Sequence, residues 1–216
     1  MKSIWLVLFA VTAATVFSAL LLDVQVLYLA AKPFLMITLL LYFVSASKGM
    51  PDWRVYVVLA LVFSWAGDIF MISSDWFIAG LSSFLIAHVF YIIAYHRTGA
   101  SRGELKPLDI IKFVLYGAVL IWLIYPGLGD MMIPVIIYAA VLLIMGVWAH
   151  KRRGATNAKS FVLVATGAIV FALSDGMIAL NKFAFEIPAE RILIMTTYIT
   201  AQYLIVQGLL NHTERT

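Results

Sequence analysis

The chain has 216 residues, of which 64% are hydrophobic and 12% are charged, with a formal net charge of +4. Soluble domains are about 45–50% apolar and about 25% charged, so this composition excludes an ordinary soluble domain and indicates a membrane protein. The sequence has no cysteine, which excludes disulfides and thiolate metal sites. It also lacks the basic, aromatic-rich soluble segment that nucleic-acid-binding proteins use, so we expect no nucleic-acid partner.

Eight apolar runs follow one another along the chain. A membrane-spanning helix needs about 20 mostly apolar residues, and the runs cover residues 4–22, 24–46, 55–72, 77–95, 110–125, 131–149, 161–180 and 192–210. The break at Asp23 is the shortest and predicts a tight hairpin between the first two runs. The first run also resembles a signal peptide, but it is long for one. We therefore predict an all-α, polytopic membrane protein: an eight-helix transmembrane bundle that forms a single domain over residues 1–216.

Basic residues alternate between the loops of this bundle. The loops after the second, fourth and sixth runs carry Lys48, Arg54, Arg97, Arg102, Lys106, Lys112, Lys151, Arg152, Arg153 and Lys159. The first, third and fifth loops carry no Lys or Arg. Short loops rich in Lys and Arg stay in the cytoplasm, so we predict that both termini are cytoplasmic. The predicted location is a multi-pass integral membrane protein, in the inner (plasma) membrane if the source is bacterial.

Two pairs of segments indicate an internal repeat. Residues 63–68 and 170–175 are both apolar segments that end in a small residue followed by Asp, and residues 84–88 resemble residues 198–202. Because the offset is four spans, the two halves, residues 4–96 and 109–210, would be parallel repeats with a site at their interface. Chance similarity between apolar helices is the alternative, and the sequence leaves both open.

A small set of polar residues lies inside the spans. Charge inside a membrane is costly and usually functional, and Asp68, Asp175, Lys32, His88 and Gln202 all fall in the middle or the predicted outer half of their runs. This shared depth predicts one polar cavity. Helical spacing supports it, since Tyr28 shares a face with Lys32, Ser64 with Asp68, His88 with Tyr91, and Tyr198 with Gln202.

Two carboxylates in a cavity of low polarity can divide the roles of general acid and general base. Asp68 and Asp175 are therefore the predicted catalytic residues, and this chemistry needs no metal or cofactor. The structural alternatives stay open: Lys32 could pair with an Asp to hold the bundle together, and His88 could be a packed core residue. Residues 127–130 spell the GxGD of intramembrane aspartyl proteases, but they lie in a short loop without the partner motifs of those enzymes.

The order of these motifs resembles that of a known family. Lys32-Pro33, the segment that ends in Gly67-Asp68, the helix with His88 and Tyr91, Ser174-Asp175, and Tyr198 with Gln202 together resemble the YhhN-like family of lysoplasmalogenases, over the whole chain. The resemblance implies hydrolysis of the vinyl ether bond of lysoplasmalogens to a fatty aldehyde and glycerophosphoethanolamine or glycerophosphocholine. It implies a lysophospholipid substrate, water and membrane lipid as partners, no protein partner and no cofactor. The predicted substrate-binding or supporting residues are Lys32, Tyr28, Ser64, His88, Tyr91, Ser174, Asn181, Tyr198 and Gln202.

A small proton-coupled transporter is the alternative function. The repeat and the buried Asp and Lys residues would then form a transport site near the middle of the membrane. A transporter of this kind should have helices that are interrupted near the charges, and Pro33 and Pro134 lie in the second and sixth runs, where such breaks would be expected. A purely structural role is a third possibility that the sequence leaves open.

Overall fold

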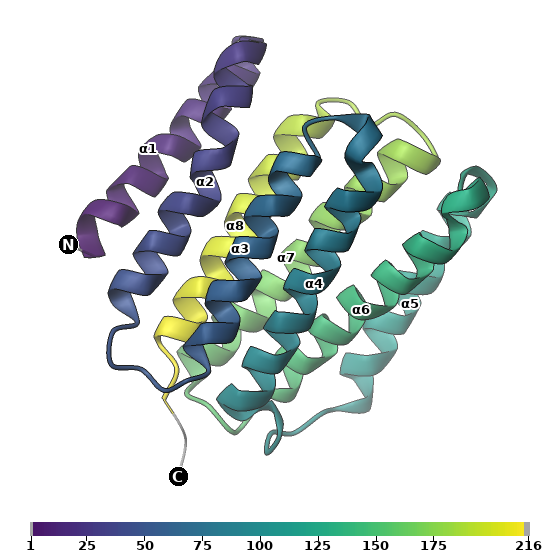
Figure 1. The fold of residues 1–216 in the computed structure, drawn as a ribbon. Coiled ribbons are helices and arrows are strands. Elements are labelled where there is room, and N and C mark those ends of the chain that lie inside the picture. Colours follow the sequence, from purple (N-terminus) through teal and green to yellow (C-terminus); the bar gives the residue numbers. More distant parts are fainter. Residues whose placement is uncertain (1, 214–216) are drawn as a thin grey trace. The chain divides into compact units, whose positions relative to one another are not determined.

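The computed structural model describes residues 2–213, and within that range every α-helix matches one predicted run (Figure 1). The helices are α1 (Lys2–Leu21), α2 (Gln25–Ala46), α3 (Arg54–Phe70), α4 (Phe77–Tyr95), α5 (Pro107–Ile124), α6 (Met132–Lys151), α7 (Ala158–Phe183) and α8 (Glu190–Leu210). Short helical turns join them: η1 (Ser74–Trp76), η2 (His96–Ala100), η3 (Tyr125–Gly127) and η4 (Gly129–Met131). The all-α prediction is confirmed. The sequence could predict these helices because their hydropathy alone distinguishes them from the loops.

Seven helical segments of the described chain are long and apolar enough to cross a membrane. The remaining helix, α3, has 17 residues, so its rise is about 26 Å. That is a few Å less than the hydrocarbon core of about 30 Å and lies at the lower limit for a span. A short helix of this kind can be accommodated by local thinning of the bilayer or by flanking side chains that reach the interface. The chain is therefore a multi-pass membrane protein, and α3 is the shortest α-helix of residues 2–213.

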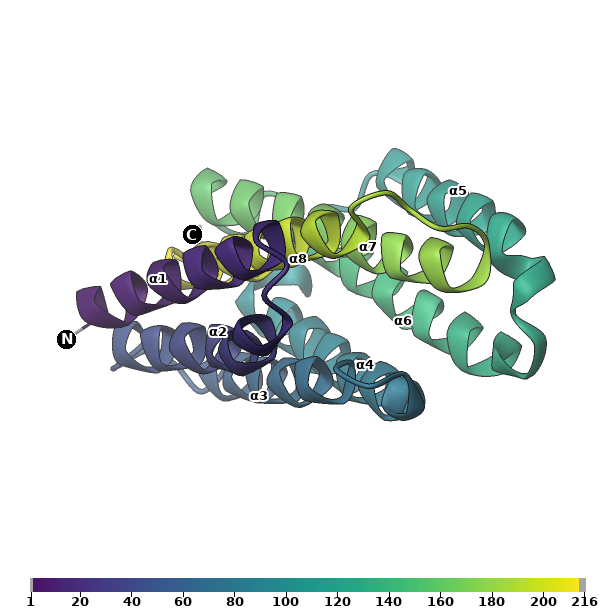
Figure 2. The same cartoon turned by 90° about the horizontal axis from the view of Figure 1, so that it is seen from above.

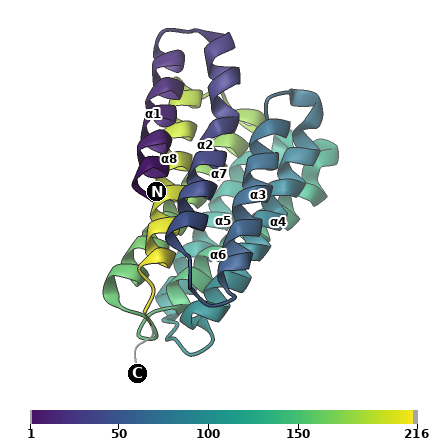
Figure 3. The ribbon, with the colours of Figure 1, turned by 60° about the vertical axis from the view of Figure 1, so that its left-hand side comes forward.

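The chain divides into two compact units, Met1–Tyr91 and Ile92–Thr216. In unit 1, α1 packs against α2 and α2 packs against α3 (Figure 3). Asp23 takes a left-handed conformation with φ 53° between α1 and α2, which confirms the predicted tight hairpin. Gly67 lets α3 approach α4 closely, since a Cβ at this position would lie 2.7 Å from the Phe84 ring. The predicted repeat of residues 4–96 and 109–210 stays a prediction.

Proline does not interrupt the helices that carry it. Pro33 lies inside α2, which is a single helix from Gln25 to Ala46, and Pro134 lies in the first turn of α6, where a missing N–H costs no helical hydrogen bond. The transporter alternative predicted breaks at these two positions. The continuous helices give that alternative no support.

In unit 2, α7 packs against α8 and α6 packs against both α5 and α7 (Figure 2). Two glycines bring α7 and α8 into backbone contact. A Cβ at Gly167 would lie 3.0 Å from the Ala201 carbonyl oxygen, and one at Gly208 would lie 2.9 Å from the Val164 nitrogen. Small residues let helices approach closely in a membrane, where packing and not hydrophobicity drives their association. The contact with α8 therefore fixes the position of α7, the helix that carries Asp175.

A buried arginine connects the basic loops at one end of unit 2. The Arg152 guanidinium donates from Nε to the Thr98 carbonyl oxygen at 3.1 Å and from Nη2 to the Ser160 hydroxyl at 2.9 Å. Burial lowers the pKa of Arg152 to about 10, and the nearby Tyr95 opposes that shift, so the side chain stays charged at neutral pH. Arg152 therefore joins η2 to the start of α7, and its charge also contributes to the charge asymmetry of the loops.

The end of α8 lies at this same basic end of unit 2. The Asn157 amide donates to the Asn211 carbonyl oxygen at 2.6 Å, and the Thr156 hydroxyl lies 2.8 Å from Nδ1 of His212. The opposite end holds the connection between α5 and α6, because a Cβ at Gly127 would lie 2.0 Å from the Phe183 carbonyl oxygen. Whichever side of the membrane holds the basic loops therefore also holds the end of α8.

Cysteine labelling tests the predicted orientation, since the chain has no cysteine of its own. Asp130 and Lys106 are exposed and lie beyond opposite ends of α5. A membrane-impermeant maleimide added to intact cells should label Asp130→Cys and spare Lys106→Cys, which should react only after permeabilisation. The reverse pattern would invert the predicted topology, and labelling of both from outside would mean that α5 does not cross the membrane.

The contact between α7 and α8 should tolerate no added volume. Gly208→Leu should lower the free energy of unfolding by about 1–3 kcal/mol, because the new side chain would overlap the α7 backbone. Thermal unfolding in detergent measures the effect. Ala158→Leu, a similar enlargement at an exposed position of α7, is the control and should leave the unfolding temperature nearly unchanged. Equal stability of the two variants would contradict this account of the interface.

Candidate functional site

The predicted site residues of unit 1 are all buried in helices α2, α3 and α4. Asp68 is 4% exposed near the end of α3, and Ser64 lies one turn earlier on the same face with no exposure. His88 and Tyr91 of α4 are also fully buried. A carboxyl group buried in this way needs polar surroundings, and the catalytic role of Asp68 stays a prediction.

Lys32 and Tyr28 lie together on α2, as their spacing of four residues predicts. The Lys32 ammonium lies 5.7 Å from the centroid of the Tyr28 ring, which is within the range of a cation–π interaction. Both side chains are buried. The lysine charge is therefore held against the Tyr28 ring and is shielded from solvent.

In unit 2, a tyrosine binds the second predicted catalytic carboxylate. The Tyr138 hydroxyl of α6 donates to Oδ2 of Asp175 on α7 at 2.5 Å. Tyr138 is buried, and Asp175 is partly exposed. Hydrogen bonds to a charged acceptor are short and strong, so this bond fixes the orientation of the carboxylate and connects α6 to α7 at the candidate site.

A second tyrosine lies close to Asp175 along α7. The Tyr116 hydroxyl of α5 donates to the Ala172 carbonyl oxygen at 2.7 Å. A Cβ at Gly176 would lie 2.1 Å from the same hydroxyl oxygen. The glycine after Asp175 therefore leaves the space that this tyrosine occupies, and side chains from α5 and α6 both reach the α7 backbone near the carboxylate.

Tyr116 and Tyr138 are not among the site residues that the sequence predicts. Each is a tyrosine in the apolar stretch of its helix, where a tyrosine commonly packs its ring and hydrogen-bonds only its tip. Position within the span could have raised Tyr138 as a candidate, because its run contains few other polar side chains. The hydrogen-bond partner of each hydroxyl depends on which helix packs against that tyrosine. The residues near the tyrosine in the sequence do not indicate which helix that is.

The other predicted residues of unit 2 make local contacts. The Ser174 hydroxyl donates to the Ile194 carbonyl oxygen at 3.2 Å, which connects α7 to α8. The Asn181 side-chain oxygen accepts from the Ile187 nitrogen at 2.8 Å and orders the connection between these helices. The Gln202 amide lies 3.5 Å from the Tyr198 hydroxyl, and both are buried. These bonds give the four residues structural roles, and their predicted contacts with substrate stay predictions.

The predicted residues thus form two sets, and each unit contains one of the two aspartates. Unit 1 holds Tyr28, Lys32, Ser64, Asp68, His88 and Tyr91, and unit 2 holds Ser174, Asp175, Asn181, Tyr198 and Gln202. The single cavity predicted from the sequence stays a prediction. Within residues 2–213, no group of three or more His, Asp or Glu side chains is arranged to hold a metal ion.

Comparison with known proteins identifies the family. Residues 27–209 match the YhhN family. The chain belongs to the YhhN family. The resemblance seen in the order of the sequence motifs is therefore confirmed, and it extends over α2 to α8.

This YhhN-family chain is similar to several proteins that are named lysoplasmalogenases. It is 35% identical to lysoplasmalogenase TMEM86A of Bos taurus over 162 residues, which are 70% of this chain and 63% of that protein. It is 29% identical to lysoplasmalogenase TMEM86B of Mus musculus over 181 residues, or 84% and 74% of the two chains. It is 32% identical to a lysoplasmalogenase of Mycobacterium tuberculosis over 164 residues, or 72% and 60%.

The match therefore covers 63% of the length of the bovine relative. No solved structure matches the chain.

The bond between Tyr138 and Asp175 should contribute measurably to stability. We expect a coupling free energy of about 1–2 kcal/mol from a double-mutant cycle of Tyr138→Phe and Asp175→Ala, because the bond joins a hydroxyl to a carboxylate away from bulk water. Thermal unfolding in detergent measures the four proteins. Tyr138→Phe combined with Ser174→Ala is the control cycle and should give less than about 0.5 kcal/mol. Equal coupling in both cycles would contradict a specific bond.

Proposed function

We propose that this chain is a lysoplasmalogenase, an integral membrane enzyme that hydrolyses the vinyl ether bond of lysoplasmalogens. The observation that carries the proposal is membership of the YhhN family together with 29–35% identity to mammalian and mycobacterial proteins of that name. A lipid substrate also suits a protein with seven helical segments that can span a membrane, because the hydrocarbon chain of the substrate can stay in the bilayer during the reaction.

The reaction needs a proton donor, water and a carboxylate. Proton transfer to the β-carbon of the vinyl ether gives an oxocarbenium ion at the carbon bonded to oxygen. The oxygen of water then bonds to that carbon and loses a proton, which forms a hemiacetal. Cleavage of the carbon–oxygen bond releases the fatty aldehyde and a free hydroxyl on the glycerophospho-compound. One water molecule is consumed, and no oxidant or metal is required.

We assign to Asp175 the stabilisation of the oxocarbenium ion and the uptake of the proton from water. A carboxylate that accepts a hydrogen bond is stabilised in its ionised form, and Tyr138 supplies such a bond at 2.5 Å. A fixed negative charge next to a developing positive charge lowers the barrier without reorganisation during the reaction. Tyr138 acts as a positioning residue, because it holds the carboxylate oxygen in one orientation.

We assign the proton donor to Asp68. This carboxyl group is almost fully buried, whereas the Asp175 carboxylate already accepts the hydrogen bond from Tyr138. The assignment leaves Lys32, His88 and Tyr91 of unit 1 as residues that support Asp68 or bind the substrate. Phosphoethanolamine and phosphocholine lysolipids are both candidate substrates.

Aldehyde release from lysoplasmenylethanolamine by the purified protein in detergent tests the activity. Asp68→Asn and Asp175→Asn should each lower kcat at least about 100-fold, since proton transfer contributes about 10²–10⁴-fold to such rates. Tyr138→Phe should lower kcat about 10-fold and leave KM nearly unchanged, as a positioning residue requires. Asp130→Asn, at an exposed loop position, is the control and should keep the wild-type rate.

The controls separate failure of the activity from failure of the assigned residues. If a mammalian relative releases aldehyde in the same detergent and the wild-type chain does not, the proposed activity is wrong. If the wild type is active and Asp175→Asn keeps its rate, only the role of Asp175 is wrong. Gel filtration of each variant establishes that it is folded and monodisperse before rates are compared.

A further inference from the structure

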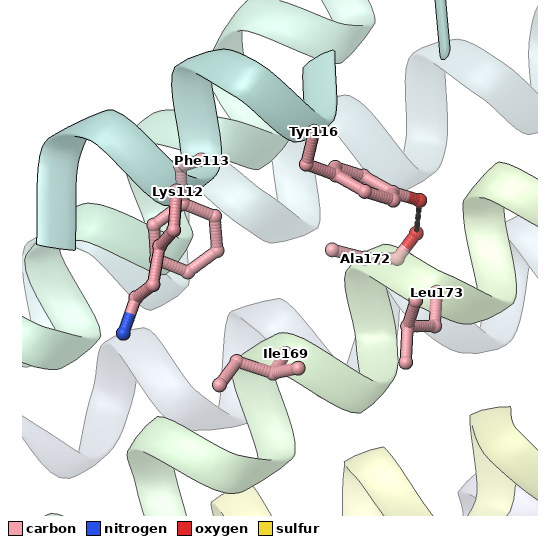
Figure 4. Close-up of a pocket in the computed structure, with 6 residues that line it drawn as sticks. All are labelled: Lys112, Phe113, Tyr116, Ile169, Ala172 and Leu173. Carbon is pink, nitrogen blue, oxygen red and sulfur yellow. Dashed lines mark hydrogen bonds between the residues drawn. The ribbon is translucent and has the colours of Figure 1, made fainter. Parts of the chain in front are cut away.

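An apolar groove lies on α5 and α7 of unit 2 (Figure 4). Its volume is about 170 Å³, and its walls are almost entirely apolar. The lining residues are Lys112, Phe113, Tyr116, Ile169, Ala172 and Leu173. Ile169 and Leu173 are exposed apolar side chains on α7, so the groove opens on a face of the helix that lipid covers in a membrane.

A basic group stands at one end of this groove. Figure 4 shows the Lys112 nitrogen pointing away from the other lining residues, with Tyr116 at the opposite end. The lysine stem therefore forms part of the apolar wall while its ammonium stays at the edge, as long basic side chains do at a membrane interface. Lys112 lies near the start of α5, and Tyr116 lies one turn further along, about 6 Å deeper.

The charges around Lys112 do not cancel. Asp109 accepts a hydrogen bond from Lys112 at 3.0 Å through Oδ1, and its Oδ2 forms an ion pair with Nη1 of Arg153 at 2.8 Å. Two cations thus share one carboxylate, which leaves a surplus of one positive charge. The Lys112 side chain is 41% exposed and the Arg153 side chain 25% exposed, so an anion from outside can reach both of them.

The wider surroundings have the same sign. Residues 96–112 and 150–160 meet at this end of unit 2, where the Glu104 nitrogen donates to the Arg153 carbonyl oxygen at 2.9 Å. Together they contain eight basic residues and two acidic ones, Glu104 and Asp109. The basic residues are Arg97, Arg102, Lys106, Lys112, Lys151, Arg152, Arg153 and Lys159. Basic pockets at the interfacial end of membrane helices attract anionic head groups.

We propose that this groove binds one hydrocarbon chain of an anionic phospholipid from the surrounding bilayer, with the phosphate held by Lys112 and Arg153. The positive charge at the end of the groove matches the negative head group of such a lipid. The apolar groove, which leads toward the membrane interior, matches its hydrocarbon chain. A zwitterionic lipid would fill the groove but not balance the surplus charge. The proposal concerns binding only and does not depend on the proposed hydrolase activity.

Native mass spectrometry of the purified protein in detergent tests the proposal with two lipids of identical chains. The wild type should bind phosphatidylglycerol at least 10-fold more tightly than phosphatidylcholine. Lys112→Gln should reduce this preference at least 5-fold, and Lys112→Arg should retain it. Lys159→Gln, which removes the same charge from an exposed position outside the groove, should behave as the wild type. Equal affinity of the wild type for both lipids, or an unchanged preference in Lys112→Gln, would overturn the proposal.

A second set of variants tests the hydrocarbon chain. Ile169→Trp should fill the groove and weaken the binding of both lipids at least 10-fold, whereas Val162→Trp, at another exposed position of α7, should not. Leu173→Trp provides an independent test if Ile169→Trp does not fold. If the groove-filling variant binds lipid as tightly as Val162→Trp does, the lipid binds elsewhere and the proposal is overturned.

Discussion

Bilayer hydrocarbon offers no hydrogen-bonding partners, so each polar group inside this chain must be satisfied by the chain itself, by water in a cavity or by a ligand. The bond from Tyr138 to Asp175 is a direct consequence of this constraint. Burial imposes the same demand on Arg152 in its loop, where the guanidinium bonds to the Thr98 carbonyl oxygen and to Ser160. Tyr138 and Asp175 are 37 positions apart in the sequence, and Arg152 and Thr98 are 54 positions apart. Polar groups whose burial without a partner would cost free energy therefore determine which helices pack together.

Helix α7 is the element on which unit 2 depends. Gly167 lets α8 approach its backbone, and Gly176 leaves the space for the Tyr116 hydroxyl from α5. Asp175 lies next to Gly176 and binds Tyr138 from α6. Small residues and one carboxylate on a single helix thus define its contacts with three neighbours. A substitution at Gly176 would act on the packing against α5 and on the candidate site together, because Gly176 adjoins Asp175.

The two ends of unit 2 differ in their chemistry. One end collects basic loops around Asp109 and the buried Arg152, and the other carries the loop between α5 and α6, which has no Lys or Arg. The proposed phospholipid contact belongs to the basic end, whereas Asp175 lies further along α7. Tyr116 contributes to both places, since it lines the groove and bonds to α7 beside Gly176.

The sequence by itself determined the helices, the family and the two candidate carboxylates. Every predicted run lies within three residues of a helix at both ends, because a span of about 20 apolar residues is a local property. Asp68 and Asp175 stood out because charge inside a membrane is rare. Tertiary structure alone decided the partners. Tyr138 meets Asp175, and Arg152 lies buried instead of exposed in its loop, because these contacts depend on how helices are rotated and how closely they approach.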